Sequence, residues 1–400
     1  MKIGILRESK TPPDKRVVLT PHQCIELLQS YSNTELAVQP SRMRKFSDEE
    51  YASLGIAIQE DLSDCDVLFG VKEVLEDSLI EGKKYFFFSH TIKKQDHNRS
   101  LLRRILDLNI TLIDYEVLTD LNGKRLVGFG RYAGVVGCYN AFLTYGRRTG
   151  LFDLKRAYLC DDRTEMELEL KKIQLSGIKI VTTGTGRVGQ GVKELLDIVG
   201  VKQVSINEFL NENFNEAVYV QLETMDYYNR IDGNPARKSD FYANPSHYES
   251  GFLKFAEVSD LFIAGHFHAP EAPSLFTREE AKSPNFTIRI VSDISCDING
   301  PIASTIRSSN IADPIYGYNP QLESEDDFDK ESAISVVAVD NLPCELPKEA
   351  SEGFGKELID NVFPHLLKED KEGVLDRATI SECGMLSKPY KYLQKFVNGR

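Results

Sequence analysis

Short apolar runs alternate with amphipathic segments along most of this 400-residue chain. The runs have the length and the β-branched or aromatic content of buried strands, and the amphipathic segments repeat their apolar positions with a helical period. Such alternation predicts βα units on parallel sheets. The expected strands are Lys2–Leu6, Val67–Val71, Tyr85–Phe88, Thr111–Ile113, Lys179–Thr182, Gln203–Ile206, Leu261–Ala264, Ile288–Val291 and Ile334–Val339. The expected helices are Pro21–Ser30, Gln95–Leu108, Gly189–Val199 and Lys348–Leu367.

Three segments depart from the alternation. Residues Gly134–Gly150 are apolar and carry several glycines, which predicts a helix that joins two domains. Residues Asn211–Glu257 are polar and predict an insertion, which is either ordered on the surface or a lid. Residues Gln321–Lys330 are acidic and predict a solvated loop.

Composition narrows the class of protein. The net charge of −13 opposes binding to nucleic acid or to an anionic membrane. No apolar run reaches the ~18 residues of a membrane span, and the first residues lack the apolar core of a signal peptide. The seven cysteines are scattered without a C-x-x-C pair, which favours reduced thiols over disulfides or a zinc site. We therefore expect a cytoplasmic protein without a bound metal.

A glycine-rich loop follows one predicted strand in the middle of the chain. Ile178–Thr183 leads into Gly184-Thr-Gly186-Arg-Val-Gly189 and an amphipathic helix that ends near Gly200. In this pattern the first glycine allows a tight turn, the second lets a pyrophosphate approach the backbone, and the third lets helix and strand pack closely. A bare glycine turn is the alternative. The strand–loop–helix context favours a dinucleotide, held at the helix N-terminus.

The choice between NAD(H) and NADP(H) depends on charges near this loop. Glu208 lies 24 residues after Gly184, where an acid at the end of the second strand would bind a ribose 2′-hydroxyl and favour NAD(H). Arg187, next to Val188 in the loop, would instead favour a 2′-phosphate and thus NADP(H). Both cofactors stay open.

The length and the single fingerprint predict two domains. We expect a discontinuous substrate and catalytic domain of residues 1–138 and 318–400. Residues 139–317 are expected to form a dinucleotide-binding Rossmann domain, with the polar insertion near 211–257. The fold class is α/β, with two doubly wound, Rossmann-like parallel sheets.

Two predicted strands of the first domain end in ionisable residues. Val67–Val71 runs into Lys72 and Glu73, and Tyr85–Phe88 is followed by His90. The carboxyl ends of parallel strands share one edge of a sheet, so these groups are candidates for proton transfer near neutral pH. A surface ion pair and a helix-capping histidine are the alternative.

Further charged residues follow strands of the same sheet. Arg7, Glu8 and Arg16 come after the first strand, and Glu116 and Arg131 come after Thr111–Ile113. Each taken singly is an ordinary surface residue. Together the arginines would form a rim that binds carboxylates through forked hydrogen bonds.

The pair His266 and His268 resembles a metal-binding arrangement, because residues two apart on a strand share a face. No third ligand has a convincing spacing. We interpret the pair as the end of a Rossmann strand beside the cofactor.

The sequence resembles the lysine-forming saccharopine dehydrogenases and the lysine–2-oxoglutarate reductase half of the aminoadipate semialdehyde synthases. More distantly it resembles alanine dehydrogenase, through the lysine and histidine segments, the glycine loop and Asp293–Asp297. The likeness covers nearly the whole chain but not the second enzyme domain of the bifunctional proteins. Its anchors are Val38–Ser41, Gln59–Asp61, Gly70–Glu73, Phe88–Lys93, Leu112–Glu116, Thr183–Gly186, Asp293–Ser295 and Val339–Ser351.

The resemblance implies two Rossmann-like domains with the active site in the cleft, and an acid–base pair of Lys72 and His90. It implies that Glu73 and Glu116 tune this pair and that Arg16 binds substrate, whereas Arg131 departs from the family pattern. In the cofactor site it places Gly184, Gly186, Arg187, Val188, Gly189, Glu208, Asp293, Asp297 and Asn341.

The reaction implied by the resemblance is the reductive coupling of L-lysine and 2-oxoglutarate to saccharopine. Its partners would be amino-acid and 2-oxo-acid substrates, and self-association into a homo-oligomer stays open. The alternatives are an alanine-dehydrogenase-like or other opine-type amino-acid dehydrogenase and, from another class, a non-catalytic nucleotide-binding regulator. The presence of both Lys72 and His90 disfavours the regulator.

Overall fold

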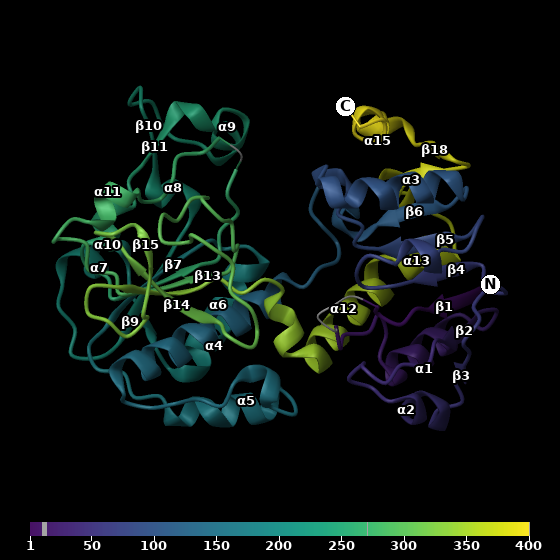
Figure 1. Ribbon diagram of the computed structural model, residues 1–400, viewed down its shortest axis with the longest axis horizontal. Helices are drawn as coiled ribbons and strands as arrows, with labels where there is room; N and C mark the ends of the chain where they lie inside the picture. Colours follow the sequence, from purple (N-terminus) through teal and green to yellow (C-terminus); the bar gives the residue numbers. More distant parts are fainter. Residues whose placement is uncertain (10–13, 270, 400) are drawn as a thin grey trace. The chain divides into compact units, whose positions relative to one another are not determined.

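The structure, a computed structural model, describes residues 1–9, 14–269 and 271–399 (Figure 1). The chain forms two compact units. The first unit combines Met1–Phe129 with Pro347–Arg400, and the second is Gly130–Leu346. Two segments far apart in the sequence therefore build one unit, which Figure 1 shows in purple and blue for the early residues and yellow for the late ones.

The first unit contains an eight-stranded sheet. Six of its strands are parallel neighbours, and the last two, contributed by the end of the chain, are antiparallel. Strands such as β5 are buried on both faces, as expected for a parallel sheet covered by helices. In spatial order the strands are β18 (Met385–Leu386), β17 (Thr379–Glu382), β6 (Thr111–Asp114), β5 (Lys84–Phe87), β4 (Val67–Phe69), β1 (Lys2–Ile5), β2 (Glu35–Val38) and β3 (Ala57–Ile58).

The helices of the first unit begin where the sequence supplies capping residues. Helix α1 starts with Pro21, and the Thr20 hydroxyl accepts a hydrogen bond from the Gln23 backbone N–H. The predicted helix 348–367 divides at Val362 into α12 and α13. The helices are α1 (Pro21–Ser30), α2 (Asp48–Ser53), α3 (Arg99–Asp107), α12 (Pro347–Asn361), α13 (Phe363–Leu367), α14 (Val374–Ala378) and α15 (Gln394–Val397).

The second unit also contains an eight-stranded sheet, with a parallel centre and two antiparallel strands at one edge. Successive residues of its strands belong to different cores: Ile180 packs in one cluster and Val181 in the other. Both faces of the sheet are therefore covered. In spatial order the strands are β15 (Ser324–Asp326), β14 (Ile315–Asn319), β16 (Ile334–Val337), β13 (Ile290–Asp293), β12 (Leu261–Ala264), β7 (Lys179–Thr183), β9 (Val218–Leu222) and β8 (Lys202–Gln203).

Two long helices pack closely on one face of this sheet. Helix α4 (Gly130–Thr149) lies against α6 (Arg187–Val199), and glycines make the approach possible. A Cβ atom on Gly191 would lie only 2.0 Å from the Arg131 carbonyl oxygen of α4. Any larger residue at position 191 would force the two helices apart.

The predicted polar insertion is ordered, and its apolar residues pack in the cluster that contains Val181. It contains α8 (Thr224–Tyr227), a hairpin of β10 (Tyr228–Arg230) and β11 (Tyr248–Ser250), α9 (Lys238–Ala243) and α10 (Leu253–Ala256). Its aromatic residues, including Phe241, Tyr248 and Phe252, are buried against the sheet. The insertion is therefore a built part of the second unit rather than a loose loop. The remaining helices are α5 (Arg163–Glu169), α7 (Ile206–Asn211) and α11 (Arg278–Ala281).

The expected fold class, two Rossmann-like α/β domains, is confirmed by the two mostly parallel sheets. The segment 318–346 differs from the expectation, which assigned it to the first unit. β16 pairs with β13 through Val291 and Val336, so this segment belongs to the second sheet. Within the described residues, every helix falls short of the length and apolarity that a membrane span needs.

Candidate active site

The carboxyl ends of β4, β5 and β6 carry the charged residues of the first unit. Lys72 and Glu73 follow β4, His90 follows β5, and Glu116 lies just beyond β6. These strands are parallel neighbours, so the residues share one edge of the sheet. The His90 Nδ1 atom is in direct contact with the Glu73 carboxylate, and both side chains are mostly buried. The structure thus places four of the residues that the sequence predicted, Lys72, Glu73, His90 and Glu116, at one edge of the sheet.

A partly buried carboxylate holds the segment that carries Lys72. Glu8, which follows β1, accepts hydrogen bonds from the backbone N–H groups of Val71 (2.7 Å) and Lys72 (2.9 Å). Burial raises the pKa of Glu8 to about 7, with a further rise from nearby Asp14. The sequence predicted Glu8 only as one of several charged residues after the first strand. Its position in the chain does not show that its carboxylate binds the backbone of Val71 and Lys72.

A second carboxylate holds the segment that carries His90. Asp114, at the end of β6, accepts hydrogen bonds from the backbone N–H and the hydroxyl of Ser89 and from the backbone N–H of Glu116 (2.7 Å). Burial raises the pKa of Asp114 to about 6. His90 itself has a φ of 53°, in the left-handed region that non-glycine residues rarely adopt. The network around Ser89 and Asp114 stabilises this strained backbone.

Glu116 lies between two cations at the same edge. One of its carboxylate oxygens is 3.4 Å from Lys93 Nζ and 3.6 Å from Arg125. The other oxygen, Oε2, is buried and has no hydrogen-bond partner among the described residues. A polar ligand or a water molecule would satisfy this atom.

The two arginines predicted to bind substrate are both paired with acids of their own unit. Arg16 is 1% exposed, its guanidinium donates to the Asp14 carboxylate at 2.5–3.2 Å, and it lies 4.1 Å above the Phe129 ring. Arg131 lies in α4 of the second unit, where it forms a forked pair with Glu194 at 2.7 and 2.8 Å. Both guanidinium groups already donate to a carboxylate of the protein. Arg131 belongs to the second unit, whereas the edge that carries His90 belongs to the first.

The glycine loop of the second unit has the geometry of a phosphate cradle. Gly184 has a φ of 90°, which makes the turn, and a Cβ on Gly189 would lie 1.9 Å from the Gly184 carbonyl oxygen. A Cβ on Gly186 would meet nothing within 4 Å, so the space above this residue is open to a ligand. Gly186 immediately precedes α6, and the Gln221 amide donates to the carbonyls on both sides of the turn. These residues fit a dinucleotide pyrophosphate at a helix N-terminus.

The strand order around this loop differs from the prediction. The strand beside β7 is β9, whereas β8 lies outside it at the edge of the sheet. Glu208 does not end a strand: it lies in the first turn of α7, where its carboxylate accepts the Ser205 backbone N–H at 2.8 Å. The acid at the carboxyl end of β9 is the exposed Glu223. The apolar run Val218–Leu222 was a usable signal for this strand, but it stood inside the segment interpreted as a polar insertion.

The remaining predicted cofactor residues follow β13 and β16. Asp293 is buried at the end of β13, where it accepts hydrogen bonds from Ser295, Cys296 and Thr305, so it shapes the following turn. Asp297 is exposed in that turn, and Asn341 follows β16 with a φ of 65°. All three lie at or beyond the carboxyl ends of parallel strands, as a cofactor site requires.

His266 follows β12 beside the glycine loop. Its Nδ1 atom lies 2.7 Å from the Thr183 hydroxyl, and burial lowers its pKa to about 3, so the imidazole is neutral. Its Nε2 atom is buried without a partner among the described residues. Across those residues no three His, Cys, Asp or Glu side chains converge as metal ligands.

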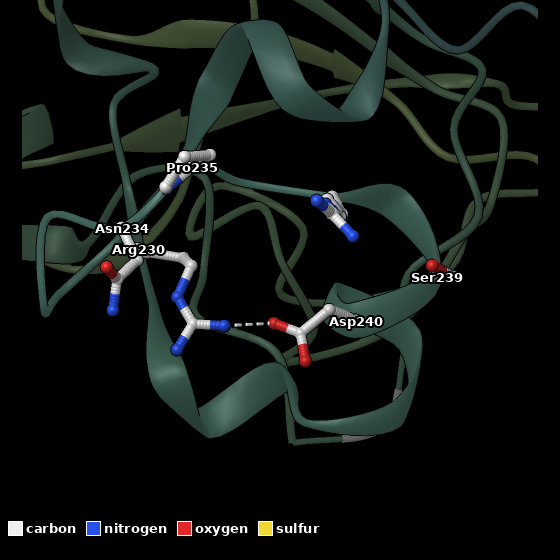
Figure 2. Close-up of a pocket in the computed structure, with 6 residues that line it drawn as sticks. Arg230, Asn234, Pro235, Ser239 and Asp240 are labelled. Atoms are coloured by element: carbon white, nitrogen blue, oxygen red, sulfur yellow. Dashed lines mark hydrogen bonds and ion pairs between the residues drawn. The ribbon is translucent and has the colours of Figure 1, made fainter.

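A pocket of about 540 Å³ lies in the insertion, lined by Arg230, Asn234, Pro235, Arg237, Ser239 and Asp240. Figure 2 shows Arg230 and Asp240 facing one another across it, joined by an ion pair. Arg230 also forms a forked pair with Asp232. The Arg230 guanidinium is therefore already engaged by two carboxylates.

Comparisons with known proteins agree with this geometry. Residues 4–136 match the family described as the N-terminal domain of alanine dehydrogenase/PNT. The solved structure of L-alanine dehydrogenase covers 100% of this chain and 99% of its own, with a TM-score of 0.65 and 15% identity. A transhydrogenase from Sinorhizobium meliloti covers 97% of this chain and 99% of its own, with a TM-score of 0.60 and 15% identity.

Curated relatives are more similar in sequence. The mitochondrial alpha-aminoadipic semialdehyde synthase of Mus musculus is 30% identical over 100% of this chain, and that of Arabidopsis thaliana is 28% identical over 98%. The chain spans about half the length of these relatives, 48% and 41% respectively. A lysine-forming, NAD(+)-dependent saccharopine dehydrogenase of Schizosaccharomyces pombe is 26% identical over 90% of this chain and 91% of its own. The chain is therefore a homologue of the aminoadipic semialdehyde synthases and of the lysine-forming saccharopine dehydrogenases, and it has the fold of alanine dehydrogenase.

Proposed function

We propose that this protein catalyses the reductive coupling of L-lysine and 2-oxoglutarate to saccharopine, and the reverse reaction. The observation that carries the proposal is the contact of His90 with Glu73, next to Lys72, at one edge of a sheet. The curated relatives named for saccharopine or semialdehyde chemistry support the choice of substrates.

The chemistry requires groups that give and accept protons in turn. The ε-amine of lysine must lose a proton before it attacks the ketone, and the resulting carbinolamine must gain one before water leaves. His90 and Lys72 are the groups we propose for these transfers, since both follow buried strands and lie at the same edge. Glu73 orients the His90 imidazole through its contact with Nδ1.

A nicotinamide cofactor would supply the hydride that reduces the imine between the two substrates. Gly184, Gly186 and the first turn of α6 would hold its pyrophosphate, because the backbone there is open and the helix N-terminus carries a positive dipole. We propose NAD(H) as the cofactor, since Glu223 ends the strand beside β7 and a carboxylate there accepts ribose hydroxyls and repels a 2′-phosphate.

The product carries several carboxylates, for which Arg16 and Arg131 are the proposed partners. Each would have to exchange its present acid for a substrate carboxylate. Arg131 is 53% exposed and pairs with Glu194, which Arg163 also contacts. If Arg131 left Glu194 to bind a substrate carboxylate, Arg163 would still neutralise Glu194. Arg16 is fully buried against Asp14, which makes it the more structural of the two.

The proposal is tested by incubating the protein with L-lysine, 2-oxoglutarate and reduced cofactor. Loss of NADH absorbance and formation of saccharopine by mass spectrometry are expected. Turnover with pyruvate and ammonia but not with lysine would indicate an alanine-dehydrogenase-like activity instead. Tight cofactor binding without turnover on any amino acid and 2-oxo acid would indicate a regulator.

A further inference from the structure

Two large aromatic side chains of the second unit meet in solvent. Phe267 is 70% exposed and Tyr242 is 41% exposed, and their ring centroids lie 6.1 Å apart. Phe267 follows β12, whereas Tyr242 belongs to α9 of the insertion. A single exposed aromatic residue is ordinary, but two in contact from different segments form an apolar surface that suggests a ligand. We call this pair the aromatic platform.

The platform stands beside the glycine loop. A Cβ on Gly184 would lie 2.8 Å from the His266 Cα atom and 2.5 Å from the Gly265 carbonyl oxygen, so the loop packs on the residues just before Phe267. The ring of His266 is 6.0 Å from that of Tyr227, in the helix that begins directly after Glu223. The platform is thus connected both to the pyrophosphate loop and to the acid at the end of β9.

We propose that the aromatic platform binds the adenine ring of the dinucleotide. This inference rests on the proposed function, because it requires that a dinucleotide occupies the glycine loop. With the pyrophosphate at Gly186 and one ribose at Glu223, the adenosine half lies on the side of β9 and α8. The platform is the flat apolar surface that adjoins this side, and every base stacks on such a surface through its π-face.

The chemistry of the surroundings favours adenine over a charged group. Burial lowers the pKa of both histidines that flank Phe267, His266 and His268, so neither carries a charge that would attract a phosphate. Oxidised nicotinamide carries a positive charge and needs room for hydride transfer, whereas adenine is uncharged and does not react. A stacking surface on an exposed loop therefore fits adenine best.

The insertion gives the platform its support. Tyr242 follows Phe241, which is buried and stacks on Tyr228 with ring centroids 4.5 Å apart. Phe241 also meets the Tyr248 ring edge-on, and the Tyr248 hydroxyl donates to Asp240 at 2.8 Å. These contacts fix α9, and so they fix the position of Tyr242. The insertion accordingly acts as a part of the cofactor site.

The test compares ligands that contain only one half of the dinucleotide. Calorimetric titrations of the full chain use ADP-ribose, reduced nicotinamide mononucleotide and NADH. We expect Phe267→Ala and Tyr242→Ala each to weaken the binding of ADP-ribose and NADH about 5- to 100-fold, the scale of one base–aromatic stack. The affinity for the mononucleotide should not change. Phe267→Tyr, which keeps an aromatic ring, should bind all three ligands like the unsubstituted protein.

The controls separate the platform from folding and from the proposed function. Phe267 is exposed, so its truncation should not shift the thermal unfolding of the ligand-free protein. Leu322→Ala, which removes an equally exposed side chain from the same unit, should leave ADP-ribose binding unchanged. Unchanged ADP-ribose affinity in both alanine variants, or a loss confined to the mononucleotide, would overturn the platform alone. An unsubstituted protein that binds no dinucleotide would overturn the proposed function as well.

Discussion

At the residue scale, His90 has the most constrained backbone of the proposed proton-transfer groups. Its left-handed φ of 53° costs on the order of 1 kcal/mol or more, and the buried Ser89–Asp114 network offsets this cost. Strain of this kind persists where surrounding contacts hold it, and it is common at active sites. The orientation of the imidazole toward Glu73 is thus built into the fold.

The first prediction concerns this proton-transfer pair. His90→Gln and Lys72→Met should each lower kcat about 10²- to 10⁴-fold, the usual effect of general acid–base catalysis. The double variant should be less than additive, because paired groups act as a unit. Steady-state kinetics and NADH titrations measure both effects, and cofactor affinity should not change. His97→Gln and Lys371→Met remove exposed residues of the same type and should keep full activity. A fully active Lys72→Met variant would contradict the mechanism.

The second prediction concerns cofactor choice. Glu223→Ser removes a carboxylate that would accept ribose hydroxyls, so NADH binding should weaken about 10- to 100-fold, as for a lost hydrogen bond to a charged group. NADPH binding should improve, since the repulsion of the 2′-phosphate is removed. Titration of both cofactors measures the ratio.

Glu208→Ser is the matched control for this prediction. Glu208 caps α7 instead of ending the strand beside β7, so its substitution should leave the cofactor ratio unchanged. A change of selectivity in Glu208→Ser with none in Glu223→Ser would restore the strand order expected from the sequence.

At the element scale, the sequence predicted the periodic elements well and their spatial order poorly. The glycine loop, β7 and α6 were read correctly because the loop glycines have strict steric roles. The strand that pairs with β7 was predicted wrongly. Both β8 and β9 follow α6 in the sequence, and only the hydrogen-bonded pairing shows that β9 lies next to β7. Residues Val218–Leu222 of β9 are mostly buried, whereas both residues of β8 are exposed. A strand inside the sheet needs apolar residues on both faces, which explains why β9 and not β8 pairs with β7.

The third prediction contrasts two glycines of one supersecondary unit. Gly186→Val should fold normally, because the added side chain enters open space, but it should abolish dinucleotide binding by filling the phosphate cradle. Gly191→Val should instead lower the free energy of unfolding by about 1–3 kcal/mol or more, because it forces α6 from α4. Denaturant unfolding and NADH titration distinguish the two effects. Intact cofactor affinity in Gly186→Val would remove the glycine loop from the site.

At the scale of the whole molecule, the site residues were predictable to the extent that they follow strands. Lys72, Glu73 and His90 could be placed at one edge because they end apolar runs. The partner of Arg131 could not be predicted, since Glu194 lies 63 residues away in the sequence and reaches it through packing that leaves no periodic signal. Asp14 lies only two residues from Arg16, but its spacing does not show that the two side chains form a buried pair. The same holds for β17 and β18, which join the first sheet from the far end of the chain.

The fourth prediction concerns stability against pH. The buried Glu345 carboxylate, near Arg156, accepts the Asn140 amide N–H at 2.9 Å, and burial raises its pKa to about 7. Its second oxygen is buried and has no hydrogen-bond partner among the described residues. Because the pKa of Glu345 is higher in the folded protein than the value near 4.3 of an unfolded chain, the protonated side chain stabilises the fold below about pH 4.3. This contribution to the free energy of unfolding is lost as the pH rises through about 7.

Glu345→Gln keeps the hydrogen bonds without titrating and provides the measurement. The stability of the unsubstituted protein relative to this variant should fall between pH 5 and pH 8, by at most about 1.4 kcal/mol per pH unit. Denaturant unfolding across this range gives the difference. A difference that is flat, or that grows with pH, would show that Glu345 is ionised in the folded protein.

The division of the first unit between two distant stretches of chain has a consequence for biosynthesis. Strand β17 pairs with β6 through Ser381 and Leu112, so the first sheet cannot close until the ribosome has translated more than 260 further residues. The second unit, Gly130–Leu346, is contiguous and can fold as it emerges. Until β17 has been translated, the nascent β6 therefore exposes an unpaired edge, which is the stage at which a chaperone would protect the chain from aggregation.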